Sequence, residues 1–216
     1  MTEYVLMPGA HYQDICNALR EQTGSTEPIR SGEIAGQIAD LSGDNHYDVF
    51  WDTYQNNDGN YRYAFASPGW TDETYNPKQP VVITKGTAEM TFRHSKITNT
   101  KVPIEIRVAS AGMMFANCEL LKTIPYIGFF GVTNTGSIFS GCYALENVTF
   151  GGEITTGFGF GNCSKLANAS VQSYLDHLVD LTGQTSPNVV FHANVGKQLT
   201  EVQKATFTTK NYTIVY

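Results

Sequence analysis

Three of the four cysteines lie in a repeated setting that could support thiol or metal chemistry. Cys118, Cys142 and Cys163 each follow a phenylalanine by three residues and precede a leucine by three. On adjacent strands the three positions would lie about 4.8 Å apart, which a disulfide tolerates. Equivalent side chains point the same way, however, and this is poor geometry for a bridge. We favour core packing of free cysteines over a disulfide or a metal site.

The other residues that could do chemistry lack partners at the required spacing. No two histidines are placed for a helical zinc site, and no Ser-His-Asp, Cys-His or G-x-S-x-G pattern occurs. The glycine run from Gly157 to Gly161 lacks the Lys-Ser/Thr of a phosphate loop. Asp48 and Asp52 share a strand face, but their neighbours single out no acid and no base. We therefore expect no enzymatic activity, no metal and no cofactor.

Aromatic residues are concentrated before the cysteine repeats. Large amphipathic rings gathered in one place are typical of sites that bind glycans or proteins. Alternation along a hairpin would instead turn half of these rings into the core, and we favour that interpretation. The rings that form the candidate ligand surface are Trp51, Tyr54, Tyr61, Tyr63, Trp70 and Tyr75.

Composition excludes several classes of partner. The 216-residue chain carries a formal net charge of −6, without the basic stripe that nucleic-acid binding needs. The N-terminus lacks the charged and apolar regions of a secretory signal, and no stretch is long and apolar enough to span a membrane. We expect a chain made in a cytoplasm with reduced cysteines, binding neither nucleic acid nor membranes.

The cysteines are positioned by a repeat whose steps are 24 and 21 residues. Apolar residues at fixed offsets with this period indicate a leucine-rich-repeat solenoid, in which stacked units share one core. The expected repeat core consists of Phe92, Phe115, Cys118, Leu121, Ile124, Phe139, Cys142, Leu145, Val148, Phe160, Cys163 and Leu166.

Two other segments flank the hairpin and repeats of residues 44–170. Residues 1–43 predict two short helices that are too narrow in apolar surface to be stable alone, so this segment is expected to dock on other proteins or on copies of the chain. Its docking residues are Ile15, Leu19, Ile34, Ile38 and Leu41.

Residues 171–216 predict a capping unit of helices and strands. Ser170 is the expected cap of a helix that ends at Gly183, and Thr200 and Gln203 have the spacing of a capping box. Strands are expected at Asn188–His192 and Tyr212–Tyr216. The predicted fold class is therefore α+β, an irregular β-rich leucine-rich-repeat solenoid with a helical N-terminal segment and an α/β C-terminal cap.

Two stretches resemble known proteins. LMPGAHYQDICNALREQTGSTEPIRSGEIAGQI resembles a leader of tail, baseplate and other virion-associated proteins of phages infecting Gram-positive gut bacteria. The pattern F-x-x-C-x-x-L over residues 61–170 is similar to BspA-like leucine-rich repeats, although the repeats are few and uneven. The second resemblance implies a right-handed solenoid with one strand per coil, and the leader implies a docking module.

These expectations converge on a non-enzymatic phage structural or binding protein, such as a decoration, head-fibre, tail or baseplate component. It would reside in the virion, contact other virion proteins, form homo-oligomers and present a surface to a host glycan or protein. The alternatives are a bacterial BspA-like surface adhesin and, from a different class, a glycan-processing enzyme. An adhesin predicts a signal peptide and a wall anchor, whereas an enzyme predicts paired carboxylates with a raised pKa.

Overall fold

The computed structural model describes residues 61, 62, 64–77 and 80–216. The chain divides into two units, Met1–Trp51 and Asp52–Tyr216, and all described residues belong to the second. Outside the described residues lie the predicted docking residues Ile15, Leu19, Ile34, Ile38 and Leu41, and the aromatic residues Trp51, Tyr54 and Tyr63.

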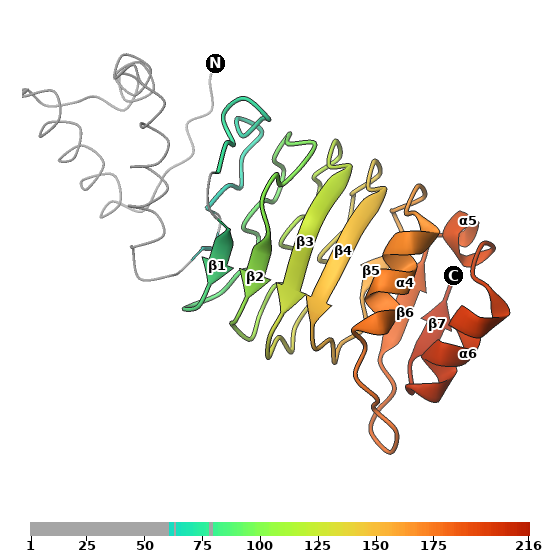
Figure 1. The fold of residues 1–216 in the computed structure, drawn as a ribbon. Helices are drawn as coiled ribbons and strands as arrows, with labels where there is room; N and C mark the ends of the chain where they lie inside the picture. The colour runs from blue at the N-terminus through green and yellow to red at the C-terminus, as the bar shows by residue number, and fades with distance from the viewer. Residues whose placement is uncertain (1–60, 63, 78–79) are drawn as a thin grey trace, which may run out of the picture. The chain divides into compact units, whose positions relative to one another are not determined.

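Four short parallel strands form the first sheet (Figure 1). They are β1 (Val81–Ile83), β2 (Ile104–Ile106), β3 (Thr123–Phe129) and β4 (Asn147–Gly152), side by side in chain order. Each strand is paired with the strand that follows it in the chain. This order brings residues about 23 positions apart into register.

The register gives the sheet two different faces, because successive side chains point to opposite sides. The inner row is fully apolar and consists of Val81, Ile104, Ile127 and Phe150. The outer row changes from strand to strand and consists of Val82, Glu105, Gly128 and Gly151.

A column of phenylalanine rings runs beneath the inner face. The centroids of Phe92 and Phe115 are 5.1 Å apart with planes only 6° from parallel, and Phe139 follows Phe115 at 5.7 Å. Phe160 extends the stack by 5.5 Å, and Phe65 contacts its other end at 5.0 Å from Phe92. Such ring pairs stabilise the core beyond their area burial.

Helix α4 (Asn168–Asp176) closes the sheet at β4. The backbone N–H groups of Val148 and Phe150 donate to the side-chain oxygens of Ser170 and Ser173, each at 2.9 Å. These hydroxyls take the place of a neighbouring strand's carbonyls. Ser170 is therefore a partner of the sheet edge and not the predicted helix cap, which is Ala167 without a side-chain hydrogen bond.

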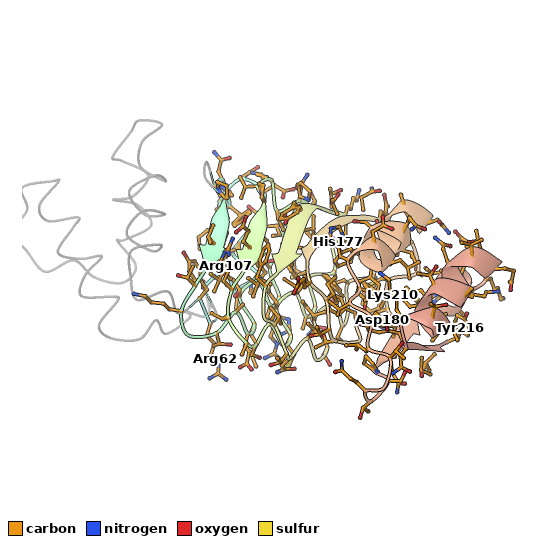
Figure 2. The ribbon with its side chains drawn as sticks, turned by 60° about the horizontal axis from the view of Figure 1, so that its bottom comes forward. Arg62, Arg107, His177, Asp180, Lys210 and Tyr216 are labelled. Carbon is orange, nitrogen blue, oxygen red and sulfur yellow. The ribbon has the colours of Figure 1, made fainter. Side chains whose placement is uncertain are left out.

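The α4 helix ends at Asp176, earlier than the predicted Gly183. Lys210 donates from its ammonium group to the carbonyl oxygens of Leu175 and Leu178, at 2.9 and 2.6 Å. A cation at this end also complements the helix dipole. The Lys210 side chain thus fixes the end of the helix (Figure 2).

A second, separate parallel sheet follows. It consists of β5 (Gly159–Phe160), β6 (Asn188–Phe191) and β7 (Thr213–Val215) in that order. The predicted strands near residues 188 and 212 are confirmed, although each is shorter than expected.

Two further helices belong to the C-terminal part, α5 (Ala193–Gly196) and α6 (Glu201–Thr209). The predicted capping box at the start of α6 is confirmed. The Thr200 hydroxyl accepts from the Gln203 backbone N–H, and the Gln203 side chain accepts from the Thr200 backbone N–H. Among the described residues, no helix has the length and apolar character needed to cross a bilayer.

The predicted fold class is wrong, because the strands do not form one continuous leucine-rich-repeat solenoid with a separate cap. They divide between two small sheets, and the division falls inside the predicted repeats, where β5 pairs with β6 and not with β4. After Leu166 the chain forms α4 where the earlier units form a strand. Helical spacing of Val171, Tyr174 and Leu175, all buried, favours this helix over a strand.

Candidate functional site

The residues assigned to the repeat core are all buried in the structure. Each of the twelve exposes at most 4% of its surface. The Cys118 and Cys142 thiols donate to the carbonyl oxygens of Phe92 and Phe115, at 2.9 and 3.1 Å. In the preceding unit, Ser95 takes the cysteine position and lies 3.4 Å from the Cys118 sulfur. One polar column thus satisfies carbonyl groups inside the core.

Burial also controls the chemistry of these thiols. It raises the pKa of Cys118 to about 11 and that of Cys163 to about 12. Burial, with the neighbouring thiols second, raises the pKa of Cys142. The thiolate is the nucleophile and the metal ligand, so the protonated thiols in this column act as packing groups.

The described members of the aromatic cluster do not form the candidate ligand surface. Tyr61 and Tyr75 are at most 2% exposed, so the favoured interpretation that they pack into the core is confirmed for these two, and their alternative placement on a ligand surface is wrong. The rings of Trp70 and Tyr75 meet the Phe65 ring edge-on, at 5.2 and 5.5 Å. Rings that pack around the end of the phenylalanine column stabilise it, and only Trp70 remains partly exposed among the three.

Two of the described histidines, His177 and His192, have local structural partners. The His192 imidazole accepts from the backbone N–H of Asn194 and caps α5. At the C-terminal cap of α4 the His177 ring nitrogen Nδ1 lies 2.8 Å from the carbonyl oxygen of Ser173. Over residues 61–62, 64–77 and 80–216, no three His, Cys, Asp or Glu side chains gather in a way that could hold a metal ion.

The outer face of the first sheet carries a different cluster, centred on Tyr126. Two adjacent glycines, Gly128 and Gly151, leave space above β3 and β4. A Cβ atom at Gly151 would lie 2.5 Å from ring atoms Cε2 and Cζ of Tyr126, and one at Gly128 would lie 2.9 Å from the Tyr126 hydroxyl. The tyrosine ring therefore lies directly on the glycine backbone.

A β-bulge places this ring. Ile124 pairs with Val148 and Ile127 pairs with Phe150, so two residues of β3 oppose one residue of β4. Bulges of this kind redirect a side chain out of the regular alternation. Tyr126 is the second of the two β3 residues in the bulge, and it projects onto the outer face while Ile127 returns to the core.

Phe130 and Arg107 extend the cluster. The guanidinium carbon of Arg107 lies 4.5 Å from the centroid of the Phe130 ring, in cation–π contact. Ring atom Cε2 of Phe130 would lie 2.7 Å from a Cβ atom at Gly128. The Phe130 backbone N–H donates to Ile106, so this contact spans two neighbouring turns of the chain.

Glu105 completes the cluster and neutralises its charge. Its Oε2 atom accepts from Nη2 and Nε of Arg107, at 2.7 and 3.1 Å. The arginine side chain is 49% exposed and the glutamate side chain 30% exposed. Fixed rings beside an oriented donor and acceptor are suited to binding a small polar surface. We call Glu105, Arg107, Tyr126 and Phe130 the Tyr126 platform.

None of the platform residues was singled out from the sequence. Their signal in the sequence is the recurrence of glycine at Gly128 and Gly151, 23 residues apart, which equals the offset between paired residues of neighbouring strands. An aromatic residue two positions before the first glycine then has room to lie flat. The bulge that directs Tyr126 outward is not readable from that spacing.

Comparison with known proteins adds no family to these observations. No protein-family model, curated protein or solved structure matches the chain. The resemblances to phage virion proteins and to BspA-like repeats therefore remain predictions.

Proposed function

We propose that the chain is a non-enzymatic binding protein of a phage virion, attached through residues 1–43 and presenting the outer face of its first sheet to a ligand. The Tyr126 platform is the observation that carries the binding part of this proposal, and the virion location rests on the sequence resemblance. It combines two aromatic rings with one arginine and one glutamate on an exposed sheet face.

The geometry of the platform supports ligand binding and not catalysis. Arg107 and Glu105 neutralise each other through two hydrogen bonds, and the rings are backed by glycine. Groups held in this way keep their geometry when a ligand arrives, which reduces the entropy cost of binding. The thiols nearby are buried beneath the other face and stay protonated.

Attachment is assigned to residues 1–43 because of their resemblance to virion-protein leaders. The short amphipathic stripes there are expected to pack on other virion proteins or on copies of the same segment. Particles are built from symmetric copies, so many platforms would be displayed together. Weak individual contacts then combine into strong attachment.

The test is the presence of the protein in purified particles. Virions grown on a host carrying this gene are analysed by mass spectrometry and by immunogold electron microscopy, with the protein expected at a repeated position. Particles without the protein would contradict the proposal.

The attachment role is tested in the full-length chain. Ile34→Asp combined with Ile38→Asp is expected to reduce incorporation at least tenfold, because charge would replace the docking stripe. Val202→Asp is the matched control, since Val202 is a helical residue that is already 76% exposed. Equal incorporation of both variants would remove the docking role from residues 1–43.

A further inference from the structure

We infer that the Tyr126 platform binds one pyranose ring of a neutral glycan, an assignment that rests on the proposed binding function but not on the virion location. The apolar face of the sugar ring would lie on Tyr126, and two neighbouring hydroxyl groups would bond to Arg107 and Glu105.

The tyrosine ring has the setting that sugar stacking needs. Its ring atoms Cε2 and Cζ lie over the backbone of Gly151, and the side chain remains partly exposed on the outer face. The ring face carries negative charge density, which attracts the polarised C–H groups on one face of a pyranose. Because the backing is backbone and not a flexible side chain, the ring cannot retreat when the sugar binds.

The charged pair retains hydrogen-bonding capacity for hydroxyl groups. Both bonds of the pair use Glu105 Oε2 and the Nε and Nη2 atoms of Arg107. In the described part of the chain, Glu105 Oε1 and Arg107 Nη1 have no further hydrogen-bond partner. A carboxylate oxygen that accepts beside a guanidinium nitrogen that donates matches two adjacent hydroxyls, each of which can do both.

The charge of the platform selects a neutral ligand. Arg107 is compensated by Glu105 at 2.7 Å, and the whole chain has a formal net charge of −6. An acidic sugar would bring a carboxylate or sulfate toward a site that offers no uncompensated cation. Repulsion from the acidic chain would slow its approach as well.

The size of the apolar area favours a sugar over a protein. Stable protein interfaces bury about 1,200–2,000 Å² in total around an apolar centre. Of the large exposed apolar residues, Val82 shares this face through its register with Glu105. The others in the described part of the chain lie outside strands β1 to β4 and are Leu120, Tyr143, Val202, Val215 and Tyr216. Two rings, Tyr126 and Phe130, beside one ion pair fit a single sugar unit.

Saturation-transfer NMR on the purified full-length protein tests the assignment. The probes are the methyl glycosides of glucose, galactose, N-acetylglucosamine and rhamnose, with methyl glucuronide as the acidic counterpart. Transfer is expected to the ring C–H protons of at least one neutral probe and to be at least several-fold weaker for the glucuronide. Absence of transfer to all four neutral probes would overturn the assignment.

Matched variants locate the site. Tyr126→Ala is expected to weaken binding by about tenfold or more, whereas Tyr126→Phe, which keeps the ring, should retain most of it. Tyr143→Ala is the control, because Tyr143 is a 55% exposed tyrosine outside the platform. Unchanged binding by Tyr126→Ala, or equal loss in Tyr143→Ala, would place the site elsewhere.

A second variant guards against a folding artefact. Glu105→Gln keeps the size of the side chain and removes its charge, so binding should fall while the thermal unfolding temperature stays close to that of the wild type. Binding that is unaffected would contradict the role of the ion pair. Incorporation into particles is measured separately. A protein that binds sugar but is absent from virions contradicts only the proposed virion location. A protein that is present in virions but binds no sugar contradicts only the proposed glycan ligand.

Discussion

The two faces of the first sheet follow opposite rules. On the inner face each turn of the chain places the same kind of residue in the same position, so that Phe92, Phe115 and Phe139 stack almost parallel. On the outer face the aligned positions change from Val82 to Glu105 and then to glycine. Repetition stabilises the stack, whereas variation creates a local site. We expect substitutions on the two faces to separate stability from binding.

The largest expected effect comes from removing one ring from the inner phenylalanine column. Phe139→Ala is expected to lower the free energy of unfolding by about 3–5 kcal/mol, because it leaves a cavity between stacked neighbours. Tyr126→Ala removes a ring from the outer face and should cost about 1 kcal/mol. Urea unfolding followed by circular dichroism measures both. Similar losses for the two variants would contradict the separation of the faces.

The edge of the sheet offers a second test. Ser170→Ala leaves the Val148 N–H without its 2.9 Å partner in a buried place, so the free energy of unfolding should fall by about 1–3 kcal/mol. Hydrogen exchange of the Val148 amide should accelerate as well. Gln172→Ala, on an exposed position of the same helix, is expected to change stability by less than about 0.5 kcal/mol. An unchanged exchange rate of the Val148 amide in Ser170→Ala would contradict the role of Ser170 as its hydrogen-bond partner at the sheet edge.

The smallest expected effect concerns a buried thiol of the inner face and depends on pH. The ordinary pKa of a thiol is 9.0, and burial raises that of Cys142. Its neutral form therefore contributes stability that is fully present below pH 9.0 and is lost as the unfolded chain ionises at higher pH. The difference in unfolding free energy between wild type and Cys142→Ala should shrink by about 1 kcal/mol between about pH 9 and pH 10. A difference that is constant over this range would contradict the burial of a protonated thiol.

Sequence spacing was enough to find the inner column but not the architecture around it. The step from Phe115 to Phe139 reports a side-chain environment that recurs with every turn, and local periodicity carries that information. Where one sheet ends and another begins depends on competition between a strand and α4. Ser170 contributes to this through a hydrogen bond to Val148, 22 residues away, and no local pattern reports such a contact.

The outer site was harder to predict for a related reason. The register of β3 and β4 is needed to see that Gly128 lies beside Gly151 and that Tyr126 lies over both. The capping box of α6, by contrast, was predictable because Thr200 and Gln203 interact within one turn of helix. Short-range hydrogen bonds can be read from sequence, whereas contacts between turns of the chain need the register.

The serine-lined closure of β4 has a consequence for crowding. An open strand edge invites pairing with any other open edge, and this hazard grows when copies are held close together. At β4 the backbone N–H groups of Val148 and Phe150 already donate hydrogen bonds to serine hydroxyls of helix α4. Neighbouring copies therefore cannot add a strand there, and dense display can proceed without growth into a fibre from this edge.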